Sequence, residues 1–167
     1  MLLFFKKVDL INDKIIQFFK YVASFLLVFV GLLIFADVLL RSAFNKPLIG
    51  VPEIIANLVV IIAFFQFAYA VSIESMLRSD FTIEKAGPKL RKFLDLLSCF
   101  LGLIFFILLA KSSYSSMVKS FISSEFEGHA SFRFPTLPLK GTIFLFSCLT
   151  AFTYLLLIIS KIFNLKK

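Results

Sequence analysis

The chain has 167 residues, 60% of them hydrophobic, and a formal net charge of +8. Soluble domains contain about 45–50% apolar residues, so this composition indicates an integral membrane protein. A bilayer span needs about 20 apolar residues, which leaves room for four spans and no separate catalytic domain. Nucleic-acid binding is not expected, because Lys and Arg lie at the edges of the apolar runs, where they mark topology and anchor helix ends.

The first 14 residues mix apolar and charged side chains. Phe4, Phe5 and Val8 stand beside Lys6 and Lys7, which suits a short amphipathic segment on the membrane surface. The same residues fit equally well as a frayed leader into the first span. They do not resemble a cleavable signal, because the apolar residues precede the charges and no small-residue cleavage site follows.

The first span is predicted over residues 15–40, which is long enough to cross a bilayer with some tilt. Its centre is the uncharged run Tyr21–Ala36. Charges return at Asp37 and Arg41, and a polar hairpin that contains a proline then leads to Glu53. A charge at the end of an apolar helix is costly and calls for a partner.

Asp37 and Arg41 are four residues apart with the acid first, the favourable order for an ion pair on one helix face. Glu53, beyond the turn, is placed to give Arg41 a second carboxylate. The group either locks the first two spans together or serves as a coupling-ion or proton site. The structural interpretation is favoured, because the group lies at the end of a span rather than in the middle of the membrane.

The second span is predicted over residues 51–73. It begins at Gly50-Val51-Pro52-Glu53, where proline loses no needed hydrogen bond and glutamate complements the positive helix end. Its polar members are Asn57, Gln66 and Tyr69. They lie at mixed helical phases and are too few for a substrate site, so we expect them to bond a neighbouring helix or another subunit.

A charged connector, residues 74–92, follows and contains the breaker Gly87-Pro88. The third span is predicted over 93–118, since the Ser-rich stretch 111–119 contains no breaker. The fourth is predicted over 139–160. The resulting fold is an all-α membrane protein, with residues 1–167 forming one four-helix domain.

Few other side chains indicate chemistry. Cys99 and Cys148 lie in apolar spans and are expected to be buried free thiols rather than disulfide or metal ligands. The single histidine, His129, falls in the predicted loop 120–138, so haem ligation within the membrane is not expected. No phosphate loop, metal-ligand spacing or catalytic triad is found, and the sequence supports no enzyme.

The distribution of Lys and Arg predicts the orientation in the membrane. Twelve lie in the N-terminal segment, the middle connector and the C-terminus, against six in the two other loops. Both termini are therefore predicted to be cytoplasmic, and the 37–53 hairpin is predicted to face outward.

The hairpin sequence resembles the signature of a known family. Asp37-Val38-x-x-Arg41-x-x-Phe44-Asn45-x-Pro47, followed by Glu53, is similar to the small membrane subunit (DctQ/SiaQ type) of tripartite ATP-independent periplasmic (TRAP) transporters. The likeness continues along most of the chain, at Ala68-Tyr69, Arg78-Ser79-Asp80 and Leu137-Pro138.

The resemblance implies a non-catalytic subunit of a secondary, sodium-coupled transporter for organic acids, of the sialic acid or dicarboxylate type, in the bacterial inner membrane. Its partners would be the large permease subunit (DctM/SiaM type) in a heterodimer, a periplasmic substrate-binding protein and membrane lipid, but no nucleic acid. The large subunit would bind substrate and any sodium, so no cofactor is expected on this chain. The residues expected to serve structure or the subunit interface are Asp37, Arg41, Asn45, Pro47, Glu53, Asn57, Gln66 and Tyr69.

Two alternatives remain open. A self-sufficient small four-span exporter would need an acidic residue inside a span for proton exchange, and Asp37, late in its helix, is the one candidate. A membrane anchor of a redox complex is disfavoured in its haem-binding form, because the predicted spans contain no histidine.

Overall fold

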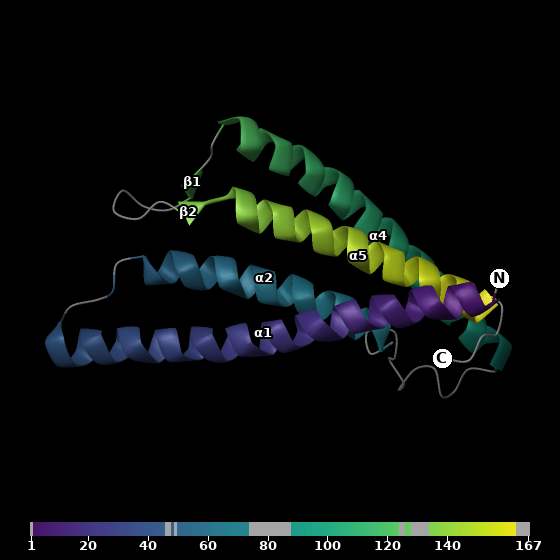
Figure 1. Ribbon diagram of the computed structural model, residues 1–167, viewed down its shortest axis with the longest axis horizontal. Helices are drawn as coiled ribbons and strands as arrows, with labels where there is room; N and C mark the ends of the chain where they lie inside the picture. Colours follow the sequence, from purple (N-terminus) through teal and green to yellow (C-terminus); the bar gives the residue numbers. More distant parts are fainter. Residues whose placement is uncertain are drawn as a thin grey trace.

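The computed structural model describes residues 2–45, 48, 50–73, 88–123, 126–127 and 134–162. In these residues it has four long helices and two short strands (Figure 1), namely α1 (Leu2–Phe44), α2 (Val51–Ser72), α4 (Pro88–Ser123), β1 (Phe126–Glu127), β2 (Phe134–Pro135) and α5 (Leu137–Ile162). All four helices are long and apolar enough to cross a membrane. The predicted four-span helical fold is therefore confirmed.

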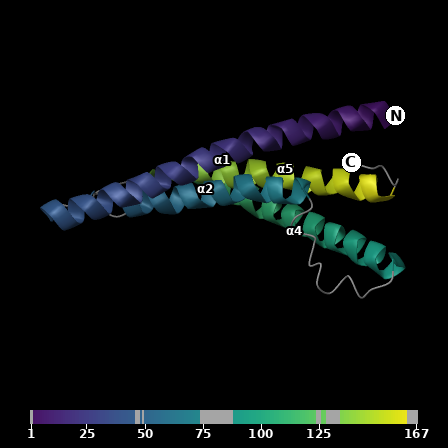
Figure 2. The same cartoon turned by 90° about the horizontal axis from the view of Figure 1, so that it is seen from below.

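The helices run alternately in opposite directions (Figure 1), so α1 and α4 begin at the end of the bundle where α2 and α5 finish. We call this the terminus end and the opposite one the hairpin end. α5 packs against α4 and α2, and α2 packs in turn against α1. Figure 2 shows α5 between α1 and α4, which diverge toward the terminus end. In the most apolar 18-residue windows, 44% of α5 is buried but 17% of α1, so α5 is the central helix.

α1 is one unbroken helix of 43 residues, about 64 Å long at 1.5 Å per residue. The helix begins at Leu2 and continues directly into the first span, so the N-terminal segment is helical rather than frayed, and its expected place on the membrane surface stays a prediction. The absence of Gly and Pro before residue 15 accounts for this continuity. α4 also runs past its predicted span, to Ser123, because the Ser-rich stretch does not stop a helix.

α1 buries one narrow seam. Ile16, Ala23 and Val30 are buried and recur at intervals of seven residues, and half-buried residues fill the steps of three and four between them. A 3–4 repeat of this kind is how helices pack side by side along a left-handed supercoil. The full seam consists of Asn12, Ile16, Phe19, Ala23, Leu26, Val30, Leu33 and Asp37.

Three phenylalanine rings join α1, α2 and α5 at the centre of the bundle. The centroid of Phe19 lies 5.0 Å from that of Phe65 and 4.7 Å from that of Phe146. Phe65 and Phe146 are 4.3 Å apart. Such tilted and edge-to-face contacts stabilise aromatic pairs beyond the area that they bury, so this cluster fixes the three helices relative to one another.

α4 and α5 approach closely at Gly102. A Cβ atom at this position would lie 2.5 Å from Cζ of Tyr154, whose ring is buried in the same cluster as Cys99. The expectation of two buried thiols is therefore right for Cys99 and wrong for Cys148, which is exposed. The side chain of Cys148 lies on a face of α5 that no described helix covers.

The described residues within the predicted loop 120–138 include regular structure. α4 occupies its first residues, and β1 pairs with β2 in an antiparallel register that places Phe126 opposite Pro135. The hydroxyl of Thr136 donates to Oγ of Ser120 at 3.2 Å, and Nζ of Lys140 donates to the same oxygen. His129 lies outside the described residues.

Candidate functional site

Asp37 lies where α1 reaches the hairpin end. Its side chain is 11% exposed, and both of its carboxylate oxygens accept a hydrogen bond. Oδ2 accepts from Nη2 of Arg41 at 2.9 Å, and Oδ1 accepts from the backbone N–H of Leu48 at 2.9 Å. The predicted ion pair is present, and the same carboxylate ties the segment between α1 and α2 back onto α1.

The two bonds of Asp37 differ in their exposure to solvent. The Arg41 side chain is 60% exposed, and with Asp37, Val38 and Ser42 it lines an open hollow of about 320 Å³. Exposed ion pairs contribute about 0–1 kcal/mol. The hydrogen bond that the Leu48 N–H donates to Asp37 does not involve the exposed Arg41 side chain. It is therefore the stronger of the two restraints on the hairpin.

Two residues in the left-handed region shape the turn. Asn45 has φ 51° and Gly50 has φ 86°. The N–H of Asn45 donates to the carbonyl oxygen of Arg41 at 3.2 Å and so ends α1, a capping role that asparagine tolerates. Gly50 lets the chain enter α2 without the steric cost of a Cβ atom. Pro47 lies outside the described residues.

One expectation for the start of α2 is wrong. Glu53 does not give Arg41 a second carboxylate, since among the described residues Arg41 pairs with Asp37 alone. Glu53 lies in the first turn of α2, where the positive helix end stabilises its charge without a cation. Asn57 forms a hydrogen bond within its own helix, in which its Nδ2 donates to the carbonyl oxygen of Glu53 at 2.8 Å, and its expected bond to another subunit stays a prediction. A short amide side chain in an apolar helix finds its nearest acceptor on its own backbone.

Tyr69 contacts a neighbouring helix, as the sequence predicts, but through its ring. Nζ of Lys20 on α1 lies 4.6 Å from the centroid of Tyr69 on α2 and 4.7 Å from that of Tyr21. A cation over an aromatic face is attracted by the negative charge density of the ring. The contact holds α1 to α2 in the half of the bundle near the terminus end.

Gln66 forms no hydrogen bond with the described part of the chain and is partly exposed. It lies four residues after the buried Ile62, at the edge of the more exposed side of α2. We call this side the alanine face, because three alanines recur on it at intervals of seven residues. It comprises Pro52, Ala56, Val59, Ala63, Gln66 and Ala70, each partly or fully exposed.

The outward faces of α1 and α4 have a different composition. They carry bulky apolar side chains, such as Phe25 and Phe35 on α1 and Phe100, Phe105 and Leu108 on α4, all at least 54% exposed. Lipid tails accommodate such side chains readily. Small residues interrupted by one polar side chain are instead typical of surfaces where two membrane helices meet. The alanine face therefore has the composition of a surface that packs against another helix.

A buried polar contact between α1 and α5 was not evident from the sequence. Nδ2 of Asn12 donates to Oγ1 of Thr153 at 3.2 Å, and Thr153 donates to the carbonyl oxygen of Leu149 at 2.9 Å. Ser147 and Thr150 also donate to carbonyl oxygens of their own helix. The feature of the sequence that could have indicated this contact is the 3–4 spacing, which places Asn12 on the seam of α1.

The described residues contain no group of three or more His, Cys, Asp or Glu that could hold a metal ion. The family described as "Tripartite ATP-independent periplasmic transporters, DctQ component" matches residues 30–164. This range includes the charged hairpin and the whole alanine face. No curated protein and no solved structure matches the chain. The chain thus belongs to the DctQ family, and it is a small multi-pass membrane subunit of a TRAP transporter.

Proposed function

We propose that this subunit is a static scaffold in the bacterial inner membrane and that its alanine face packs against the large permease subunit. Both termini are cytoplasmic in this proposal, and the 37–53 hairpin faces the periplasm. The large subunit binds the transported organic acid and the sodium ions that drive uptake, and a periplasmic binding protein delivers the substrate. This chain then carries neither substrate nor cofactor.

The observation that supports this proposal is the contrast between the alanine face and the other outward surfaces. Ala56, Ala63 and Ala70 leave a shallow strip along α2, into which a second helix backbone can approach closely. Gln66 lies beside this strip with its amide free of partners in the described residues. A polar group in the hydrocarbon region is costly unless it is bonded, and a donor or acceptor on the large subunit would remove that cost.

The charged hairpin fits the same role. Asp37 has both oxygens occupied by bonds within its own hairpin, and a proton taken up by this carboxylate would weaken both of them. The position of Asp37 therefore favours a role as a rigid link between α1 and α2 over a role in cyclic proton exchange. The hairpin thereby fixes the position of α2, and with it the alanine face.

The proposal is tested by co-purifying the large subunit with an affinity-tagged small subunit. Ala63→Trp should reduce recovery of the large subunit about tenfold or more, because overpacking costs about 1–3 kcal/mol. Ala36→Trp is the matched control, since Ala36 is an exposed alanine on α1, and it should leave recovery unchanged. Gln66→Leu should reduce recovery about threefold, the effect expected from one interhelical hydrogen bond in a membrane.

Thermal unfolding of each purified small subunit separates loss of the interface from loss of the fold. The proposal requires Ala63→Trp to unfold at the temperature of the wild type. It is rejected if Ala63→Trp retains the large subunit at the wild-type level, or if Ala36→Trp loses it to the same extent. Transport by the small subunit alone in proteoliposomes would also contradict it.

A further inference from the structure

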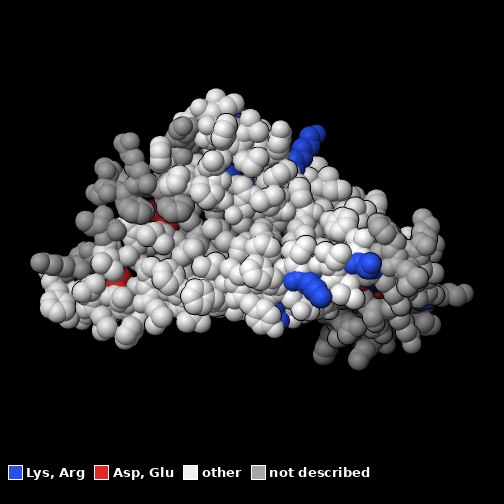
Figure 3. Space-filling model, viewed as in Figure 1, with Lys and Arg blue, Asp and Glu red and all other residues white. Residues whose placement is uncertain are grey.

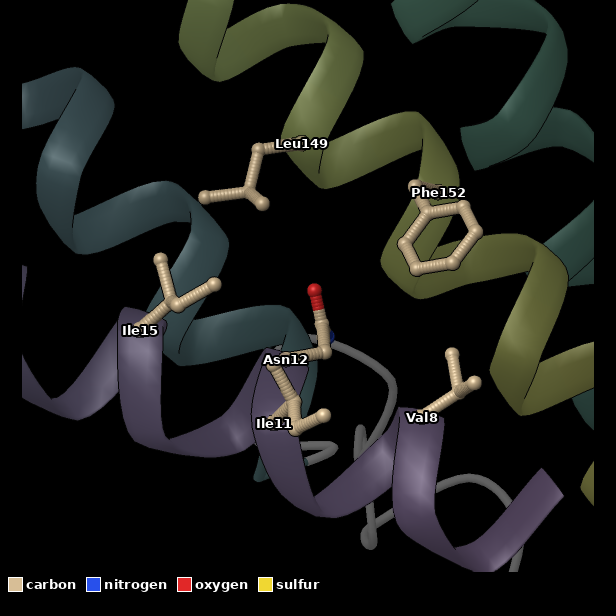
Figure 4. A pocket seen from close by; sticks show the side chains of 6 residues that line it. All are labelled: Val8, Ile11, Asn12, Ile15, Leu149 and Phe152. Carbon is tan, nitrogen blue, oxygen red and sulfur yellow. The ribbon is translucent and has the colours of Figure 1, made fainter. Parts of the chain in front are cut away.

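A groove of about 260 Å³ separates the first turns of α1 from α5 near the terminus end (Figure 4). Five of its six lining residues are apolar, and they come from both helices. The groove is lined by Val8, Ile11, Asn12 and Ile15 of α1 and by Leu149 and Phe152 of α5. It does not overlap the charged hairpin or the alanine face.

Asn12 is the polar group in this groove, and half of its amide is already bonded. Its residue is 4% exposed, and its Nδ2 donates to Thr153. Figure 4 shows its side-chain oxygen directed into the space between Leu149 and Phe152. No described residue donates to this oxygen. The groove therefore offers one hydrogen-bond acceptor within an apolar lining.

Two lysines lie beside Ile11 on α1, on the side of this residue that is away from the other lining residues of the groove. Lys7 and Lys14 lie four residues before and three residues after Ile11 on α1, so the three side chains share one helix face. Both lysines are exposed, and neither forms an ion pair with a described residue. Figure 3 shows basic side chains on the surface over the N-terminal half of α1, a stretch that also carries Asp9 and Asp13.

We propose that this groove binds one anionic phospholipid. An acyl chain lies along the apolar lining, Lys7 and Lys14 hold the phosphate, and a headgroup or glycerol hydroxyl donates to Asn12. The two exposed lysines beside Ile11 favour an anionic headgroup over an apolar protein helix as the occupant. The inference requires only that the chain lies in a membrane and does not depend on the proposed scaffold role.

The absence of tryptophan from the chain makes a direct test possible. Ile11→Trp places one reporter at the rim of the groove, and Leu145→Trp places a control reporter at an exposed position of α5. Each full-length variant is reconstituted in phosphatidylcholine vesicles that contain increasing amounts of brominated phosphatidylglycerol. Brominated phosphatidylcholine serves as the neutral comparison.

At Ile11→Trp, half-maximal quenching by brominated phosphatidylglycerol should occur at about a 25-fold lower mole fraction than quenching by the neutral lipid, given about a fivefold effect for each lysine. At Leu145→Trp the two lipids should quench equally. Adding Lys7→Gln and Lys14→Gln should remove the preference, whereas Lys111→Gln with Lys119→Gln on α4 should preserve it. Equal quenching by both lipids at Ile11→Trp would overturn the proposal.

The same reporter identifies a competing occupant. In the complex with the large subunit, quenching at Ile11→Trp by phosphatidylglycerol should persist. If the large subunit abolishes it, a protein segment covers the groove and the lipid proposal fails. Binding of phosphatidylglycerol that survives loss of both groove lysines would likewise refute the site, since it would show attraction to the membrane charge alone.

Discussion

The two bonds of Asp37 predict an ordered series of stabilities. Asp37→Ala removes both, and it should cost about 1.5–4 kcal/mol, of which about 1.5–3 comes from a hydrogen bond to a charged acceptor and about 0–1 from an exposed ion pair. Asp37→Asn keeps an acceptor for the Leu48 N–H but loses the charge, so it should cost about 1–2 kcal/mol. Arg41→Ala removes the exposed pair alone and should cost less than about 1 kcal/mol.

Unfolding of the purified variants in mixed micelles, followed by circular dichroism as dodecyl sulfate is added, measures these free energies. The order is more informative than any single value. If Arg41→Ala destabilises as much as Asp37→Ala, the ion pair rather than the loop restraint holds the hairpin. If Asp37→Asn is as damaging as Asp37→Ala, the bond to Leu48 contributes nothing. Either outcome would refute the interpretation of Asp37 given above.

Three further predictions concern helix packing, and the same unfolding assay measures each. Gly102→Ala should destabilise by about 1–3 kcal/mol, because its Cβ atom would overlap the buried Tyr154 ring, whereas Gly31→Ala, with nothing within 4 Å, should be neutral or stabilise by up to about 1 kcal/mol. Equal effects would argue against the close approach. Phe146→Ala should cost about 3 kcal/mol, at the low end of the range for core aromatic residues, because apolar tails also solvate this ring when the helices separate on unfolding. A loss below 1 kcal/mol would mean that the three-ring cluster is not a structural centre. Lys20→Met should cost about 1 kcal/mol by removing the cation from two tyrosine rings, and unchanged stability would exclude a role for this contact.

The sequence predicted the four spans because length and hydropathy are sufficient to identify a membrane helix. It also predicted the start of α2, since Gly50, Pro52 and Glu53 each have a local preference for that position. The ion pair of Asp37 with Arg41 followed from spacing on one helix face. These features depend on residues close in the chain, which is why the sequence alone could predict them.

The sequence alone could not predict which face of each helix packs against its neighbours. The central parts of α1 and α4 are apolar around nearly their whole circumference, so hydrophobic periodicity there does not distinguish the seam from the lipid-facing surface. The bond between Asn12 and Thr153 joins residues 141 positions apart, and nothing local specifies it. Asn57 illustrates the same difficulty, since its amide bonds the carbonyl oxygen of Glu53 on its own helix and the spacing of polar residues along the span does not reveal this partner. The alanine face became visible once the structure had shown which side of α2 is buried.

The central position of α5 has a consequence for biogenesis. α1 and α2 can form their hairpin as soon as both have entered the membrane, but the principal packing partner of α4 is α5, which also supplies contacts to α2. Since α5 follows α4 in the chain, α4 remains poorly packed until α5 has also entered the membrane. Domains generally acquire structure in the order of synthesis, and in this protein the packing of α4 waits for α5. Chains arrested before α5 should therefore be exposed to membrane proteases that recognise unassembled helices.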